Sequence, residues 1–429
     1  MRTLPSSPAH ASVRRGSRPV TNAYGAIVLG ALLGNFALDV SADVLNLRAL
    51  RPELPPEFRD VYDAERYRRA QEYTRARTWF ELVPATAGLA VLLAFWFGGG
   101  FGALDRAVRA LGLGPLPTGL LYLGALGLGA TVLRLPFRWW STFVVEERFG
   151  FNKTTPRTFW ADVAKGLVLS AVLGGALLTA VLWLFARTGT TAWLWCWLVA
   201  TLFVVVVQYV APTWIMPLFN RFTALDPGTL RDAILAYARG VDFPLEEVFV
   251  IDGSRRSTKA NAFFTGFGRR KRIALFDTLV QSLSTPELVA VVAHEVGHYK
   301  RRHVLVGMLL AILQTGATFF LLSLVVDRPG LFAAFQVAEP SVYAGLVFFA
   351  LLVGPFELVL SVALHVLSRR HEFEADAFAL ATTGAGDRLA SALKRISADG
   401  LSNLTPHPLY VFLHYSHPPL RDRVRALGA

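Results

Sequence analysis

The 429-residue sequence contains a single cysteine, Cys196, which lies within an apolar run. One thiol excludes an intramolecular disulfide, and its apolar surroundings argue against a thiolate-ligated metal. Charged residues make up only 17% of the chain, and neither a glycine-rich phosphate loop nor a nucleic-acid-binding motif is present in the sequence. We therefore expect no nucleic-acid partner, although the net charge is +12.

Long apolar runs, in contrast, are abundant. The sequence is 53% hydrophobic and has a mean hydropathy of +0.43, and runs of about 20 apolar residues are typical of membrane-spanning helices. The polar, arginine-bearing N-terminus, residues 1–23, is predicted to be disordered. Seven spans are predicted after it, at approximately Tyr24–Leu45, Trp79–Phe97, Leu116–Leu135, Gly166–Ala186, Ala192–Ile215, Val304–Val326 and Val342–Leu367.

Two polar segments of the sequence lie outside these spans, one between the fifth and sixth spans and one after the seventh. Five spans occupy residues 24–215, the first polar part is 216–303, two more spans occupy 304–367, and the second polar part is 368–429. The first polar part predicts a helix at 228–240, a strand at 247–251 and a hairpin pairing 259–265 with 272–276. The second predicts a helix at Ser368–Thr382. The fold class is an all-α polytopic membrane protein with a mainly helical polar domain that carries a small β-hairpin.

Arginines are distributed unevenly about the predicted spans. With seven spans, both polar parts and the loop after the first span lie on one side of the membrane. That loop carries eight arginines: Arg48, Arg51, Arg59, Arg66, Arg68, Arg69, Arg75 and Arg77. The positive-inside rule therefore predicts that the polar parts face the cytoplasm.

The strongest chemical motif is His-Glu-x-x-His at residues 294–298. On a helix, His294 and His298 share a face, so their imidazoles can bind one metal ion, and Glu295 lies close enough to act as general base for a water. Ser284 or Thr285 can cap this helix, Pro286 suits its first turn, and Glu287 can complete a capping box. The alternative is a buried helix that carries two histidines by chance.

A catalytic zinc site needs a third protein ligand and leaves its fourth position for water. Glu372 and Asp376 are four residues apart on the helix predicted at 368–382, so they share a face. Glu372 can supply the ligand, and Asp376 can accept a hydrogen bond from a ligating histidine. The alternative is a solvated acidic face, to which Glu374 is well suited.

These motifs resemble the type I CAAX prenyl proteases, membrane zinc endopeptidases that process farnesylated proteins. The resemblance covers the chain from about Val61 onward. It is carried by His294–His298 with Glu372–Asp376, and by the segments Ser141–Glu147, Phe149–Lys153, Pro217–Asn220, Asn261–Phe264 and His414–Pro419.

The resemblance implies seven helices around a water-filled chamber that a zinc domain closes at one end. It implies that Glu372 is the third ligand of one Zn²⁺ per chain, that Asn261 binds substrate backbone, and that His417 and Arg423 lie near the zinc. An exposed strand carrying Asn261 could accept an extended peptide, and His417 or Arg423 could stabilise an oxyanion. The arginine-rich composition and compact length suggest a bacterial member in the inner membrane, for which a prenylated substrate is not expected.

The sequence thus predicts a membrane zinc metalloendopeptidase that cleaves near the C-terminus of CAAX-type or similar membrane-associated substrates. Its expected partners are a peptide or protein, with or without a lipid group, and membrane lipid. One alternative is a general quality-control protease of membrane proteins. A transporter with a structural metal site is a second, against which Glu295 argues, since closed structural sites have no adjacent base. Polar residues within the spans predict a hydrated interior: Asn35, Asp39, Glu81, Gln208, Gln314, Glu357 and His365.

Overall fold

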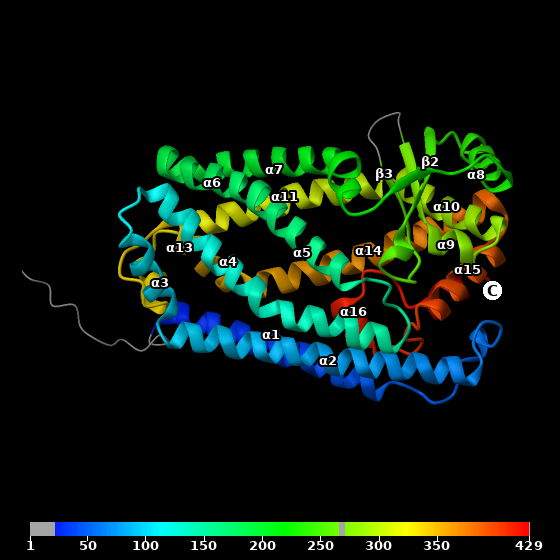
Figure 1. The fold of residues 1–429 in the computed structure, drawn as a ribbon, viewed down its shortest axis with the longest axis horizontal. Helices are drawn as coiled ribbons and strands as arrows, with labels where there is room; N and C mark the ends of the chain where they lie inside the picture. Colours follow the sequence, from blue (N-terminus) through cyan, green and yellow to red (C-terminus); the bar gives the residue numbers. More distant parts are fainter. Residues whose placement is uncertain (1–21, 266–270, 429) are drawn as a thin grey trace, which may run out of the picture.

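The computed structural model describes residues 22–265 and 271–428. Long helices run along the long axis of the molecule, and the strands and several short helices gather at one end (Figure 1). The N-terminus predicted to be disordered lies outside the described residues, apart from Asn22 and Ala23. Asn22 caps the first helix, α1 (Ala23–Arg48), because its side chain accepts a hydrogen bond from the Gly25 N–H at 3.0 Å.

Five helical segments among the described residues are long and apolar enough to cross a membrane, and a bent pair makes a sixth. One of the five, Pro156–Leu218, turns back on itself at Gly189, and across the turn the Cys196 thiol lies 3.9 Å from the Val181 carbonyl. Counting its two arms separately brings the candidate spans to the predicted seven. They are α1, α2 (Ala64–Phe97), α4 (Pro115–Trp140), α5 (Pro156–Leu169) with α6 (Gly175–Thr188), α7 (Ala192–Val210), α11 (His303–Val325), and the pair α13 (Val342–Leu352) and α14 (Gly354–Thr383).

Three helices extend beyond the predicted spans, because a helix can continue past the end of an apolar run. The helix that carries the second span begins at Ala64, so the charged residues before Trp79 form the start of α2. The third continues to Trp140 and then through a π-helical segment, Ser141–Glu146. The predicted start of the fourth span, Gly166, lies within α5, which begins at Pro156. Backbone hydrogen bonds hold a helix together on either side of the bilayer boundary, so hydropathy locates the membrane but not the helix ends.

The last span differs most from its prediction. α13 and α14 are bent by 56° about Val353, and Pro355 lies in the first turn of α14, where its missing N–H costs nothing. α14 then runs without a break from Gly354 to Thr383. The helix predicted at Ser368–Thr382 is therefore the end of this long helix, which leads directly from the membrane into the polar domain.

The polar domain contains one four-stranded sheet with the order β1-β2-β4-β3. β2 (Leu245–Ile251) is parallel to β4 (Lys271–Phe276), and β1 (Phe222–Ala224) and β3 (Ala262–Thr265) pair antiparallel at the two edges. The predicted hairpin pairing is confirmed, but its first strand begins at Ala262, so Asn261 lies just outside it. Most of the connecting loop, residues 266–270, lies outside the described residues.

Both polar parts of the chain build one hydrophobic core. Ile234 of α8 (Thr229–Gly240), Ile273 of β4, Val292 of α10 (Thr285–Lys300) and Leu389 of α15 (Gly386–Asp399) belong to this one buried cluster. Leu279 of α9 (Asp277–Ser282) also belongs to it. The last two helices of the domain are α16 (Pro408–His414), which packs against α1 and α14, and α17 (Leu420–Ala426), which packs against α15. The predicted parts 216–303 and 368–429 therefore fold together rather than separately.

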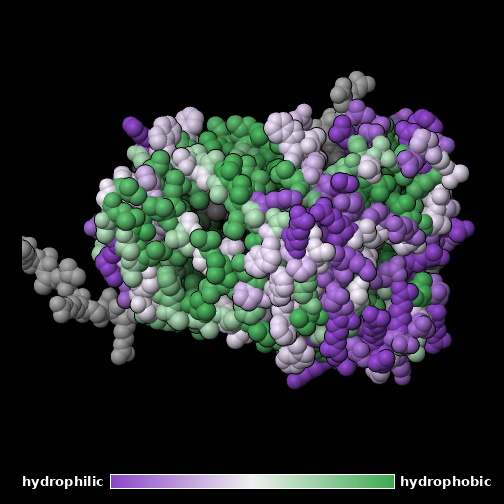
Figure 2. Space-filling model, viewed as in Figure 1, coloured by the Kyte–Doolittle hydropathy of each residue, from purple (hydrophilic) through white to green (hydrophobic). Residues whose placement is uncertain are grey.

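A second aromatic core closes the opposite end of the molecule. It contains Trp96, Phe335 and Phe348, together with residues of α3 (Gly100–Arg109) and α12 (Pro329–Ala334). Between these two cores the spans leave most of their apolar surface exposed: the apolar windows of α2 and α11 are only 6% buried. Figure 2 shows apolar side chains over the membrane half, polar ones over the domain half, and an opening within the apolar half.

Candidate metal centre

The helix that carries the His-Glu-x-x-His motif is α10, and its start is capped as the sequence predicts. The Ser284 N–H and hydroxyl donate to the Glu287 carboxylate at 2.8 and 2.7 Å, and Pro286 lies in the first turn. Glu287 also accepts a hydrogen bond from Ser391 on α15 at 2.6 Å. One carboxylate therefore both caps α10 and ties it to the C-terminal part of the domain.

A glycine allows α10 to lie against α14. A Cβ on Gly297 would be 3.0 Å from the carbonyl oxygen of Ala375 and 3.1 Å from its Cα, closer than a side chain is normally tolerated. Gly297 faces α14 and has no side chain that would hold the two helices apart. This contact places His294 and His298 opposite Glu372.

The metal-binding geometry of these three residues is favourable. His294 Nε2 and His298 Nε2 lie 3.2 Å apart, and Glu372 oxygens lie 3.5 and 3.3 Å from them. Two nitrogens bound to one tetrahedral zinc at about 2.0–2.1 Å would be about 3.3 Å apart. Glu372 Oε2 is buried and accepts no hydrogen bond among the described residues, although Arg423 lies 3.3 Å from it, so it can still bind a cation. The three side chains therefore fit a metal of this kind.

Asp376 lies behind His294, as the spacing predicts. His294 Nδ1 is 2.8 Å from Asp376 Oδ1, and Arg423 of α17 donates to both oxygens of Asp376 at 2.8 and 2.7 Å. Burial alone would lower the pKa of His294, but Asp376 and then Glu372 raise it to about 9. The site thus concentrates negative charge around His294, which favours a cation.

Glu295 and His417 complete the surroundings of the three ligand candidates. Burial raises the pKa of Glu295, although His294 and His298 oppose the shift. A carboxylate with a raised pKa is a stronger base. His417 Nε2 lies 3.4 Å from Glu372 Oε1, and its side chain is 64% exposed. His417 is therefore open to a bound ligand, whereas Arg423 is buried and held by Asp376.

One histidine near the site was missed by the sequence reasoning. His303, the first residue of α11, places its Nδ1 3.0 Å from His298 Nδ1 and its Nε2 3.1 Å from Glu374. Glu374, whose spacing suggested a solvated face, therefore also reaches toward the metal centre. The available signal was the clustering of eight of the nine histidines at or after position 294.

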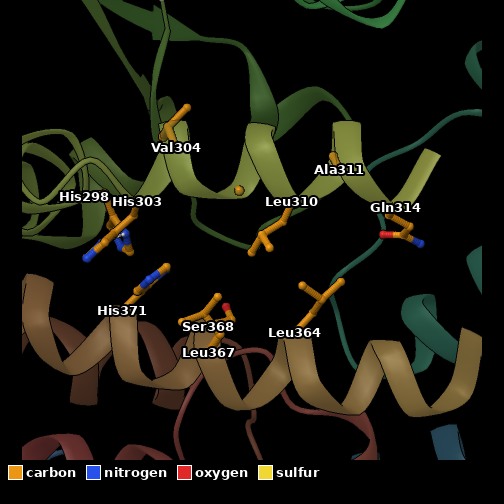
Figure 3. A pocket seen from close by; sticks show the side chains of 11 residues that line it. His298, His303, Val304, Leu310, Ala311, Gln314, Leu364, Leu367, Ser368 and His371 are labelled. Atoms are coloured by element: carbon orange, nitrogen blue, oxygen red, sulfur yellow. Dashed lines mark hydrogen bonds between the residues drawn. The ribbon is translucent and has the colours of Figure 1, made fainter. Parts of the chain in front are cut away.

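A cavity of about 380 Å³ opens beside these histidines, between α11 and α14 (Figure 3). His298, His303 and His371 stand at one end of it. Its remaining walls are mostly apolar and include Leu310 and Leu364. Apolar space thus leads from the membrane helices to a candidate metal ligand.

Asn261 stands apart from this cluster: among the described residues it has no hydrogen bond or ion pair to any of the seven other predicted site residues. Its side-chain oxygen accepts a hydrogen bond from the Ala262 N–H at 2.8 Å, and its side chain is exposed. Nearby, Lys259 donates to Tyr73 at 2.7 Å and to Glu146 at 2.8 Å. This ion pair, which the sequence reasoning missed, ties the chain before β3 to α2 and to the π-helical segment.

The segment Phe149–Lys153 lies against the same stretch of chain. The Thr258 N–H donates to the Phe151 carbonyl at 3.1 Å, and the Lys153 N–H donates to the Arg256 carbonyl at 3.0 Å. These bonds connect the loop between α4 and α5 with the chain that leads into β3. The motif therefore has a structural effect on the position of Asn261.

Comparison with known proteins identifies two families that together cover most of the chain. Residues 43–221 match the family described as CAAX prenyl protease N-terminal, five membrane helices, and residues 224–429 match peptidase family M48. A CAAX prenyl protease 1 homolog of Arabidopsis thaliana is 36% identical, over 93% of this chain and 96% of its own. CAAX prenyl protease 1 of Saccharomyces cerevisiae is 35% identical, over 87% and 88%.

The crystal structure of S. mikatae Ste24p has a similar fold. It superposes with a TM-score of 0.90 at 31% identity and covers 95% of this chain and 100% of that one. The three matched proteins named here are eukaryotic, so they give no support to the predicted bacterial origin.

Proposed function

The chain belongs to peptidase family M48, within the CAAX prenyl proteases, and is an integral-membrane metalloendopeptidase; from this premise we propose that it cleaves peptide bonds near the C-terminus of CAAX-type substrates. The observation that carries the proposal is the meeting of His294, His298 and Glu372 with Glu295 beside them. A bound metal flanked by an unligated carboxylate is an arrangement that can activate a water to hydrolyse an amide.

The metal is zinc, one ion per chain, held by His294, His298 and Glu372. When bound, it supplies Lewis acidity, which polarises the scissile carbonyl and lowers the pKa of a nearby water. Glu295 takes the proton of the attacking water and delivers it to the leaving amine. Asp376 keeps His294 in the tautomer that presents Nε2 to the metal.

His417 is the better candidate for stabilising the developing oxyanion. Its exposed imidazole can reach a substrate. Removing one hydrogen-bond donor directed at such a charge costs about 2.7–4 kcal/mol in a serine protease. Arg423 donates two of its nitrogens to Asp376, and its third lies 3.3 Å from Glu372. Arg423 therefore acts on Asp376 and Glu372 rather than on the substrate.

Edge pairing supports an extended peptide as substrate. β3 pairs with β4 and lies at the edge of the sheet, so its other edge is available to a peptide strand, with Asn261 at its start. The cavity between α11 and α14 offers apolar space beside His298 for a hydrophobic or lipid-modified part of the substrate. Its lining and size are within the range of ligand pockets.

Polar contacts made by ionisable residues of the spans support a hydrated chamber. Asp39 of α1 lies 3.8 Å from His414 of α16, and His365 contacts the Leu413 carbonyl at 2.9 Å, so ionisable groups of the spans meet polar groups of the domain. Cysteines placed at positions 35, 39 and 357, after Cys196 is replaced, should react with a membrane-impermeant reagent in permeabilised membranes. Three unreactive positions would contradict the chamber.

The arginine-rich segment 48–77, which comprises the end of α1, the loop after it and the start of α2, supports a cytoplasmic position for the catalytic domain. Arg66 pairs with Asp399, and Glu57 of this loop pairs with Arg421 and Arg425. The loop and the domain therefore lie on the same side, and that side carries the arginine excess.

The two glutamates separate the roles of base and ligand. Glu295→Gln should keep about one zinc and lose turnover by about 10²–10⁴-fold, because it removes the base but no ligand. Glu372→Ala should lose zinc and activity together. Metal analysis beside peptide cleavage checks both, and a metal-free Glu295→Gln protein or a tightly zinc-loaded Glu372→Ala protein would show that the roles are misassigned.

The substrate class is tested with one C-terminal peptide, prepared with and without a farnesyl group. A CAAX-type activity should give a higher kcat/KM for the farnesylated form. Equal cleavage of both peptides, and of unrelated membrane-protein segments, would indicate a general quality-control protease instead.

A further inference from the structure

The two imidazoles of the candidate metal centre have different partners on their far sides. His294 Nδ1 contacts the Asp376 carboxylate directly, at 2.8 Å. His298 Nδ1 contacts no carboxylate among the described residues; it lies 3.0 Å from Nδ1 of His303. A metal-bound imidazole usually donates its second N–H to an acceptor that fixes its tautomer and orientation. For His298 that acceptor is another imidazole.

One placement of the imidazole protons gives each hydrogen bond between His298, His303 and Glu374 both a donor and an acceptor. His298, with Nε2 toward the metal, donates from Nδ1 to the unprotonated Nδ1 of His303. A neutral imidazole has one donor and one acceptor nitrogen, so His303 then carries its proton on Nε2. His303 Nε2 lies 3.1 Å from Glu374 Oε2, and Arg370 donates to the other Glu374 oxygen at 2.9 Å. The hydrogen bonds therefore run in one direction, from the metal ligand to a carboxylate.

The backbone is shaped to make this contact. Residues five apart do not share a face of a continuous helix, so His298 and His303 could not meet if α10 simply continued. The break comes at Arg302, which has a left-handed φ of +60°, an uncommon conformation for a residue with a side chain. This turn directs His303 back onto His298. Strained backbone of this kind persists where the surroundings require it.

Packing holds the His303 ring in one orientation. Its side chain is 5% exposed, and it stacks on His371 of α14 with ring centroids 4.0 Å apart and planes 8° from parallel (Figure 3). A ring that only filled space would need no polar partner on both of its nitrogens. Both His303 nitrogens have one.

We propose that His303 is a positioning residue, which together with Glu374 fixes the tautomer and orientation of His298 as a metal ligand. This inference about His303 rests on the proposed function, in which His298 is a metal ligand. His303 does for His298 what Asp376 does for His294, and both supporting carboxylates, Glu374 and Asp376, come from α14.

The test measures metal binding by the full-length protein in detergent, without any substrate. Zinc affinity is determined by competition with a chromophoric chelator, and the absorption spectrum of the Co²⁺-loaded protein reports the ligand geometry. His303→Leu should lower zinc affinity by about 10–100-fold and alter the Co²⁺ spectrum. His303→Asn should retain most of the affinity, because the Asn oxygen can take the place of Nδ1 as acceptor.

Arg370→Gln is the matched control. It removes an exposed ion pair to Glu374 but leaves the Glu374–His303 bond, so zinc affinity should stay near wild type. Unfolding of the chelator-treated variants shows whether each folds. Where His303→Leu does not fold, Glu374→Gln provides the test, since it keeps the ring packed and weakens its carboxylate partner; a smaller loss of zinc affinity is expected.

The inference would be overturned if folded His303→Leu protein bound zinc with wild-type affinity, or if the Leu and Asn variants lost equal zinc affinity. Where His303→Leu does not fold, wild-type zinc affinity in Glu374→Gln would overturn it. Failure of the proposed function looks different. In that case His298→Ala would itself keep tightly bound zinc, or the wild-type protein would bind none.

Discussion

Arg423→Met should destabilise the protein by about 3–5 kcal/mol, the usual cost of removing one partner of a buried ion pair. Arg423 has a 9% exposed side chain and donates twice to Asp376, whose side chain is 2% exposed. Without the guanidinium, the Asp376 carboxylate keeps only His294 as a partner. The cost comes from that unpaired buried charge, more than from the loss of the contact itself.

A second substitution tests this explanation. In the Arg423→Met background, Asp376→Asn removes the unpaired buried charge. The loss of unfolding free energy in the double variant should therefore be about 1–3 kcal/mol smaller than the sum of the losses in the two single variants. The four proteins are compared after chelator treatment, so that metal binding does not contribute. Unfolding is followed by the fluorescence of the ten tryptophans. Effects that add to within about 0.5 kcal/mol would refute the reasoning, because independent sites behave in that way.

Three further variants test other parts of the structure. Asn261→Ala should lower kcat/KM by about 1–2 kcal/mol of transition-state stabilisation with unchanged zinc content, and a wild-type rate would remove Asn261 from the substrate site. Gly297→Ala should cost about 1–3 kcal/mol of stability and weaken zinc binding, because its Cβ would press on Ala375; thermal unfolding and chelator competition measure both. A hydrogen bond from the backbone N–H of Glu57, and a weaker effect of the hydrogen bond from Arg421, lower the pKa of the Glu57 carboxyl group to about 2. A depressed carboxylate pKa stabilises the fold above about pH 4.5, so the stability difference from Glu57→Gln should be full at pH 7 and shrink as the pH falls toward about 2.

Several features of the candidate site could be predicted because they depend on residues close together in the chain. The i,i+4 spacing of His294 and His298 puts both on one face of any helix, and Ser284 and Glu287 cap it through bonds within one turn. The same spacing rule relates Glu372 to Asp376. Hydropathy located the membrane segments because burial in lipid requires a minimum apolar length.

The predicted helix boundaries were wrong where a helix continues beyond its apolar run, because hydropathy does not report backbone hydrogen bonding. α14 crosses from the membrane into the polar domain as one helix, although its apolar run ends near Leu367. The backbone hydrogen bonds of a helix are the same on both sides of that point. Hydropathy therefore divided a single helix into a span and a separate surface helix.

The local sequence determined which helices form and which residues share their faces; the tertiary structure decided which faces meet. Nothing in the spacing of α10 shows that Gly297 lets it approach α14, or that a left-handed Arg302 turns His303 back onto His298. Arg423 reaches Asp376 from a segment 47 residues away in the chain. Such contacts depend on how helices pack in three dimensions, and their residues have no fixed spacing in the sequence.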